Sequence, residues 1–293
     1  MMRCISSIFL IIFSFSAMAQ VIDFDRPEKV NSVRTAQLRL KLSREYTFMI
    51  PGAGKPIRKQ ETMDLVLLTD IKIEKLNQKG QPVTLLLTPR IVGGALNGRA
   101  INQNLLKGRM IRAELEKYPC KFTEADGKSA LPNEAIVILS ALFRQQQNIT
   151  YPEILGQSRK FTAGQKWVPE TNMIIKNLKE RNVAINKNNL KAQAQFENKF
   201  KVNGVQCVAV VLNLSSVGTH AYDFQVKTRL ILPVSKADGG VIRLAREGVE
   251  VVDRKLISGD FAASGSEVQI ITKEQMEVTY VPPKKSSSFL NIF

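Results

Sequence analysis

The chain has few of the residues that build metal centres and nucleophilic catalytic sites. Its 293 residues include three cysteines, one tryptophan and a single histidine, His220. A zinc site draws most of its ligands from cysteine and histidine, so this composition fits no typical zinc site. A Ser-His-Asp arrangement would need His220 as its base, and the sequence contains no G-x-S-x-G elbow. We therefore predict no cofactor and no metal, and the sequence favours a non-enzymatic role.

Long hydrophobic runs are also scarce. Residues 1–19 have the parts of a cleavable signal peptide: Arg3, an apolar run from Ile5 to Phe15, and Ala17-Met18-Ala19 before the cleavage position. The apolar run is about half of the roughly 20 residues that a membrane-spanning helix needs. Cys4 precedes this run, which argues against lipoprotein processing. We expect a bacterial protein exported to the periplasm or the exterior, with no transmembrane span.

Acidic residues are fewer than basic ones, and the formal net charge is +16. The densest basic stretch is Lys176–Lys201, which contains Lys187 and Lys191. It is interpreted either as a solvated connection or as a patch that contacts an anionic polymer of the cell envelope. Nucleic acid is not expected as a partner, because the protein is exported and this stretch lacks interleaved aromatic residues.

Two cysteines, Cys120 and Cys207, follow the leader. An oxidising compartment would allow one disulfide between them. Cys207 lies in the apolar run Val205–Leu212, where a buried free thiol fits equally well. Both alternatives stay open at this point.

The dominant pattern is an alternation of apolar and polar residues with period two. It is clearest over Phe224–Leu232 and recurs in Ile71–Glu74, Val83–Leu87 and Ile111–Glu116. Such alternation is typical of antiparallel sheets with one buried and one wet face. We predict a mainly β protein made of two related antiparallel halves, as curved sheets or as a sandwich, with one bridging helix.

Helical spacing is found in few places. Pro132–Phe143 predicts the clearest helix, and Asn172 to about Arg181 is a second candidate. The predicted organisation is a signal peptide (1–19), a first β half (20–130), a helix and linker (131–160), a second β half (161–281) and a C-terminal tail (282–293).

Two short matches support a relationship between the halves. Phe122–Gly127 resembles Val234–Gly239, and Gly80 and Gly204 each precede an apolar strand. They are interpreted either as an internal repeat or as chance similarity between segments of a β-rich chain.

The middle of the chain resembles a group of uncharacterised exported bacterial β-rich proteins. In those proteins a helix precedes a Val-x-Val-Gly-x-x-Trp entry into a second sheet. Here Gly164 and Trp167 match, whereas Phe161 and Ala163 stand in place of the valines. The resemblance implies the fold class and export, and it carries over no functional residue.

Three further residues are candidates for contact with a ligand or partner. Trp167, the only tryptophan, is either a core anchor or a stacking surface at the mouth of a sheet. The tail ends in an apolar segment that contains Phe289 and Phe293 and either folds back on its own sheet or docks on a partner.

These features favour a non-enzymatic protein of the cell envelope with a binding or scaffolding role. Its expected partner is an anionic envelope polymer or an envelope protein. The alternative is a hydrolase of envelope polymers that uses carboxylates which the sequence does not place.

The leader generates the first prediction. When the full chain is expressed in a bacterium, the mature protein should begin at Gln20, because Ala17-Met18-Ala19 fits signal peptidase. Intact mass and N-terminal sequencing measure this directly. A mature chain that retains Met1 would contradict it.

Overall fold

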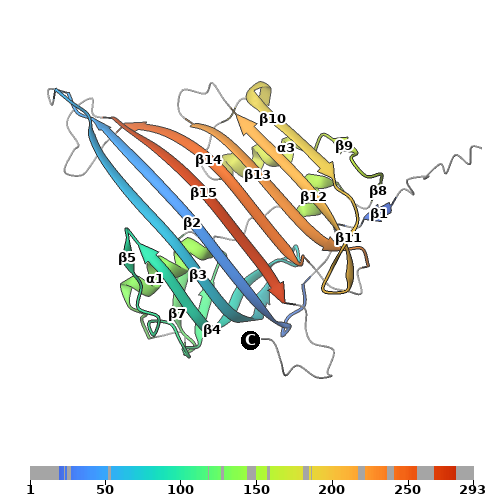
Figure 1. Cartoon of the computed structure of the whole chain (residues 1–293), viewed down its shortest axis with the longest axis horizontal. Helices are drawn as coiled ribbons and strands as arrows, with labels where there is room; N and C mark the ends of the chain where they lie inside the picture. The colour runs from blue at the N-terminus through green and yellow to red at the C-terminus, as the bar shows by residue number, and fades with distance from the viewer. Residues whose placement is uncertain are drawn as a thin grey trace, which may run out of the picture.

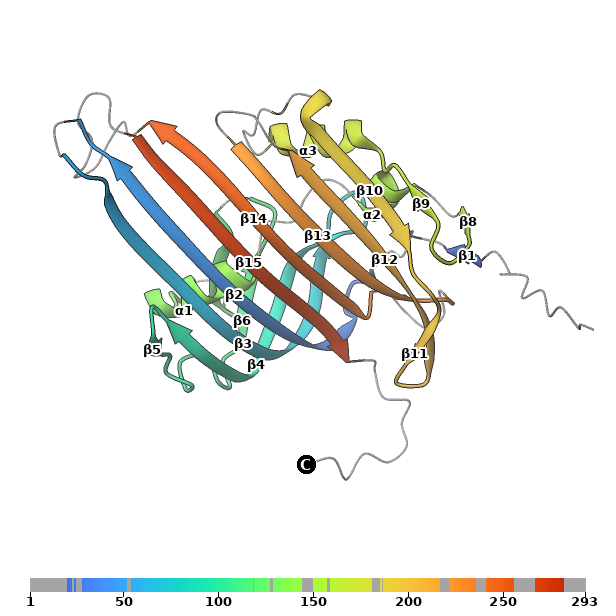
Figure 2. The same cartoon turned by 45° about the horizontal axis from the view of Figure 1, so that its top comes forward.

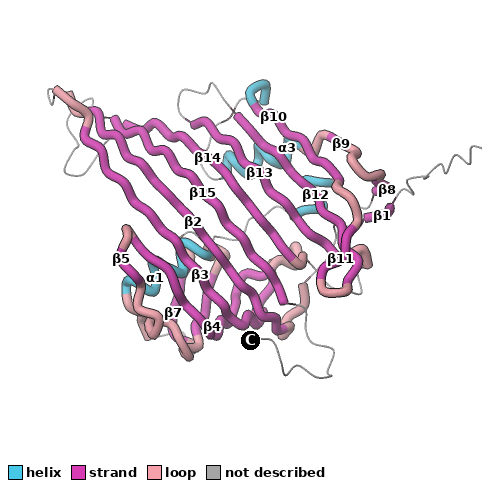
Figure 3. The backbone as a smooth tube through the Cα atoms, in the orientation of Figure 1, coloured by secondary structure: helices cyan, strands magenta, loops and turns pink. Residues whose placement is uncertain are grey.

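Long antiparallel strands make up most of the molecule. The computed structural model describes residues 20–22, 24, 28–51, 54–117, 119–126, 129–143, 150–156, 159–180, 185, 187–216, 222–235, 241–255 and 267–281. The fold is mainly β, and its main sheet is curved but not closed (Figure 3).

The first part of the described chain holds seven strands and the first helix: β1 (Gln20–Ile22), β2 (Val33–Met49), β3 (Ile57–Leu76), β4 (Pro82–Leu96), β5 (Arg99–Ala100), β6 (Ile111–Glu114), β7 (Lys121–Glu124) and α1 (Asn133–Leu142). The remaining elements are α2 (Tyr151–Leu155), β8 (Arg159–Phe161), β9 (Lys166–Trp167), α3 (Thr171–Glu180), the 3-10 turn η1 (Lys187–Asn189), β10 (Leu190–Phe196), β11 (Phe200–Val202), β12 (Val205–Ser216), β13 (Tyr222–Pro233), β14 (Arg243–Lys255) and β15 (Glu267–Val281).

Thirteen strands form one sheet. Its order is β7-β6-β4-β3-β2-β15-β14-β13-β12-β10-β9, with β5 beside β4 and β11 beside β12 (Figure 1). The short strands β1 and β8 pair separately. Each half of the chain contributes one run of consecutive hairpins, and the curved-sheet alternative of the sequence prediction is the one found.

The two halves meet through the pairing of β2 with β15. This antiparallel ladder runs from Val281 opposite Thr35 to Glu267 opposite Met49. Along the chain, α1 lies between the halves as predicted. In space it packs on the first half, so strand pairing rather than a helix connects the halves.

Across the central strands, the register places even-numbered residues opposite even-numbered residues. Leu38 lies opposite Val278, Val278 opposite Leu244, Leu244 opposite Leu230, and Leu230 opposite Val210. Because side chains alternate between the faces of a sheet, these even-numbered residues share one face. We call it the helix face, since the side chains under α1, α2 and α3 belong to it, and we call the opposite one the open face.

Two main cores form on the helix face, the side of the sheet on which the helices lie in Figure 2. In the first, Leu40, Leu65 and Leu139 of α1 are at most 1% exposed. In the second, Phe161 and Phe196 are at most 2% exposed and their rings lie 5.9 Å apart. Each such buried side chain contributes roughly 1.5–3 kcal/mol to the stability of the fold. The two cores therefore hold the helices on this face.

Two of the three helices in the described residues match the helices predicted from the sequence. The buried residues of α1 (Ala135, Ile138, Leu139 and Leu142) follow helical spacing, and the predicted helices are confirmed as α1 and α3. Residues 151–155 were predicted as linker, which is wrong. They form α2, which begins with a capping box between Thr150 and Glu153 and has Pro152 in its first turn.

A backbone constraint in β4 generates a prediction. Gly94 has a φ of +122°, and a Cβ there would lie 1.8 Å from the Asp64 carbonyl oxygen. Gly94→Ala should therefore lower the free energy of unfolding by at least about 2 kcal/mol, as measured by urea denaturation. The neighbouring Gly93→Ala is the matched control, because a Cβ at Gly93 meets nothing within 4 Å. Equal stability of the two variants would contradict the register of β3 and β4.

Candidate functional site

A wide groove crosses the open face. Its volume is 960 Å³, and it reaches from β4 through β3, β2, β15, β14 and β13 to β12. This hollow therefore touches seven neighbouring strands of the curved sheet. A second hollow of 540 Å³ adjoins it and shares Lys41, Asp64, Lys227, Glu247 and Gln275 with it.

The strand register explains the lining of the groove. One row across the sheet consists of directly opposed residues: Asp64, Lys41, Gln275, Glu247, Lys227 and Asn213. The next row is Thr62, Ser43, Lys273, Val249, Gln225 and Ser215. With about 4.8 Å between strands, a row of six residues spans about 24 Å. The groove therefore offers charged, amide and hydroxyl groups over the length of an extended peptide segment.

Carboxylates of the open face have cationic partners. Lys41 Nζ lies 3.9 Å from Asp64 Oδ2, and Lys227 Nζ lies 3.5 Å from Glu247 Oε1. Next to them, Arg243 Nη2 donates to Glu277 Oε2 at 2.8 Å. Burial alone would raise the pKa of Glu277, but the hydrogen bonds and charges around it, chiefly from Arg243, outweigh burial and lower this pKa. Glu277 is therefore ionised at neutral pH, unlike a general acid.

A separate cavity of 280 Å³ lies on the helix face. Its apolar floor comes from β13, β14 and β15, and its walls come from the segment before β2, the turn between β3 and β4, and the start of α2. The lining residues include Leu230, Leu232, Leu244, Val278, Tyr280, Phe24, Arg34, Lys79, Thr150 and Tyr151.

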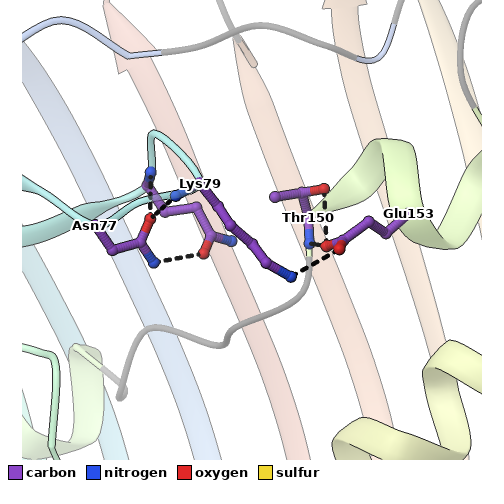
Figure 4. Close-up of polar contacts among 5 residues, drawn as sticks. Asn77, Lys79, Thr150 and Glu153 are labelled. Atoms are coloured by element: carbon purple, nitrogen blue, oxygen red, sulfur yellow. Dashed lines mark hydrogen bonds and ion pairs between the residues drawn. The ribbon is translucent and has the colours of Figure 1, made fainter.

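An ion pair joins the two halves at this cavity (Figure 4). Lys79 Nζ donates to Glu153 Oε1 at 2.7 Å, although the residues are 74 positions apart. The turn that carries Lys79 is held by Asn77, whose Oδ1 accepts the backbone N–H of Lys79 at 2.9 Å and of Gln81 at 3.0 Å. We call the Lys79–Glu153 pair the clasp.

Glu153 has two roles in this contact. Its Oε2 accepts the Thr150 backbone N–H at 2.7 Å, which caps α2, while Oε1 accepts the Lys79 ammonium. Burial by itself would raise the pKa of Glu153, but the hydrogen bonds from Lys79 and Thr150 outweigh burial and lower this pKa. The carboxylate form is therefore the one that the fold stabilises.

The structure places one of the two predicted basic residues, Lys191, beside the groove. Lys191 is exposed on β10, directly opposite Ser215, which lines the groove. Lys187 is exposed in η1, just before β10. Of this pair, Lys191 extends a row of the open face, and neither residue lies in the helix-face cavity.

Trp167 lies on the other side of the sheet. It pairs opposite Ala194, its ring centroid is 4.5 Å from that of Phe161, and its Nε1 donates to the Leu155 carbonyl at 3.3 Å. The side chain is half-buried against the second core, which matches the core-anchor alternative.

The disulfide alternative is not what the structure shows, because no disulfide joins Cys120 and Cys207. Cys120 packs against the core under α1, where burial raises the pKa of its thiol. Cys207 is buried in a different cluster, with Ala209 and Ile231 on the open face. Each thiol has its own apolar surroundings, so the two do not meet. Phe289, Phe293 and His220 lie outside the described residues.

Comparisons with known proteins give no family. No family model matches the chain, and no curated protein matches it. Among solved structures, a lipovitellin structure is similar over 87% of this chain and 26% of its own, with 10% identity and a TM-score of 0.30. The chain thus spans about a quarter of that protein's length, and this low score carries no argument. Within the described ranges no helix is both long enough and apolar enough to cross a membrane.

The clasp generates a prediction about pH. Lys79→Met should raise the pKa of Glu153 towards the ordinary value of 4.5, which a carboxyl NMR titration can follow. At neutral pH the variant should lose about 1 kcal/mol or less of stability. Because the pKa of Glu153 is lower in the folded state, its ionised carboxylate stabilises the fold at pH values above 4.5. This contribution is lost as the pH falls through the pKa of the folded state. The difference in stability between the variant and the unmodified protein should therefore shrink in acid.

The control for the clasp is Lys75→Met, on the strand β3 that leads into the turn of Lys79. Lys75 pairs with Glu116 at 3.4 Å, and both side chains are more than half exposed. This variant should leave the pKa of Glu153 unchanged. An unchanged pKa in Lys79→Met as well would refute the clasp.

Proposed function

We propose that this protein is an exported, non-enzymatic component of the bacterial cell envelope that binds or scaffolds a partner through the groove of its open face. The observation that carries the proposal is the row from Asp64 to Asn213, which presents polar side chains on six neighbouring strands. A groove of this length suits an elongated partner better than a small substrate.

The chemistry of the groove favours a protein segment over a polysaccharide. The lining mixes both charges with amides and hydroxyls, and among the described residues no aromatic side chain lines the groove. Sugar-binding grooves commonly use aromatic faces, whereas a peptide with both charges and backbone amides is complementary to alternating Lys and Asp or Glu. The basic flank at Lys191 adds attraction for an acidic part of the partner.

The state of the carboxylates supports a binding role over hydrolysis. Asp64 and Glu247 are each within ion-pair distance of a lysine, and the pKa of Glu277 is lowered. Glycoside hydrolysis needs one carboxylic acid that keeps its proton near neutral pH, which requires a raised pKa. Among the carboxylates of the described residues for which a shift is resolved, Glu153 and Glu277, both pKa values are lowered.

Charge reversal in the groove tests this function. The double variant Lys41→Glu with Lys227→Glu should retain at least tenfold less of its partner from envelope extract, because it breaks two cross-strand pairs and changes the row from net neutral to four negative charges. Quantitative mass spectrometry of the retained proteins measures the loss.

The matched control is Lys55→Glu with Lys201→Glu. Both residues are exposed, lie outside the groove and change the net charge equally. Equal loss in the two double variants would show a nonspecific charge effect and contradict a groove site. Release of soluble fragments from purified cell wall by the mature protein would instead support the hydrolase alternative.

A further inference from the structure

We propose that the cavity on the helix face binds the acyl chain of a neutral single-chain lipid. This site is distinct from the groove and does not rest on the proposed function. The floor of the cavity is made of aliphatic side chains from three strands, among them Leu230, Leu244 and Val278. Its volume of 280 Å³ is at the lower end for small-ligand sites, which fits one chain of moderate length.

The cavity lies at the seam between the two cores. Val278 belongs to the core under α1, Leu230 and Leu232 belong to the core under α2, and Leu244 of β14 packs against the latter core. The helix α1 covers the first core and α2 covers the second. Apolar side chains of the sheet between the two helices therefore form the floor of the cavity. Apolar surface is stabilised by contact with another apolar group at roughly 25 cal/mol per Å², and an acyl chain supplies that contact.

The rim of the cavity is polar but balanced in charge. Arg34 Nη2 pairs with Glu28 at 2.8 Å, and Lys79 pairs with Glu153 at 2.7 Å. Each cation near the cavity therefore has its own carboxylate, and an anionic headgroup would have to compete with it. This balance favours an uncharged headgroup over a free carboxylate.

Two tyrosines supply hydrogen-bonding groups beside the aliphatic floor. Burial is the main cause that raises the pKa of Tyr151 and of Tyr280, so both phenols keep their protons at neutral pH. The guanidinium of Arg34 lies 4.1 Å from the centroid of the Tyr280 ring and fixes this side of the cavity. A protonated phenol can donate to the ester oxygen of a lipid headgroup.

The clasp closes one side of the site. Lys79 and Thr150 both line the cavity, and the Lys79–Glu153 pair spans from the turn of the first half to α2 of the second (Figure 4). A partly exposed ion pair of this kind contributes little stability, so it can open without unfolding either half. The clasp should therefore control how fast a ligand enters and leaves.

Calorimetric titration of the mature chain with 1-monodecanoylglycerol tests the proposal, with decanoate as the charged comparison. We expect saturable binding of the neutral lipid and at least tenfold weaker binding of decanoate. Leu244→Trp fills the cavity and should reduce binding of the neutral lipid at least tenfold. Its matched control is Val249→Trp, on the same strand but on the open face, where Val249 is 40% exposed; this variant should bind normally.

Two further variants test the site independently of Leu244→Trp and separate it from the groove. Lys79→Met should keep the fold and release the lipid several times faster in stopped-flow measurements, even if Leu244→Trp folds poorly. The groove variant Lys41→Glu with Lys227→Glu should bind the lipid normally, which separates this site from the groove. Absence of lipid binding by the unmodified protein, or equal binding by Leu244→Trp and Val249→Trp with both folded, would overturn the proposal.

Discussion

The backbone pairing of β2 with β15 determines how the two halves of this protein share one sheet. All fifteen residues of β15 are in register with β2, so the first strand of one run of hairpins adjoins the last strand of the other. A slip of one residue there would move every side chain of one half to the opposite face. The helix face and the open face exist as continuous surfaces only because parity is preserved across this junction.

The two faces have different chemistry as a result. On the helix face, Leu38, Val278 and Leu244 form one apolar row that runs from the first half into the second. The cavity lies over the part of this row that the helices do not cover. On the open face, Lys41, Gln275 and Glu247 continue a polar row across the same strands. The groove and the cavity are thus opposite sides of one junction, and neither would exist in an isolated half.

Local patterns in the sequence were enough to predict the fold class. Alternation over Phe224–Leu232 predicts β13, and apolar spacing after Pro132 predicts α1, because both signals act between neighbouring residues. The sequence prediction does not include the helix α2, because Pro152 is typical of a linker as well as of a first helical turn. The pattern Thr150-x-x-Glu153 was a capping-box signal that could have identified it.

The candidate sites were much harder to predict. The groove depends on the register of seven strands and on sheet curvature, and the clasp joins residues 74 positions apart. Neither has a local sequence signature. Lys191 was predicted from local charge density, and the structure places it opposite Ser215 at the end of a groove row. Trp167, chosen because it is unique, packs into a core on the other face.

Cross-linking of the central junction tests this account most directly. Gln37 and Thr279 are directly opposed on the open face of β2 and β15. The pair Gln37→Cys with Thr279→Cys should oxidise readily to a disulfide, because opposed residues of antiparallel strands have Cα atoms about 4.5–5.5 Å apart. The pair Gln37→Cys with Gln275→Cys is four residues out of register and should stay reduced. Cross-linking of the second pair but not of the first would contradict the junction on which both faces depend.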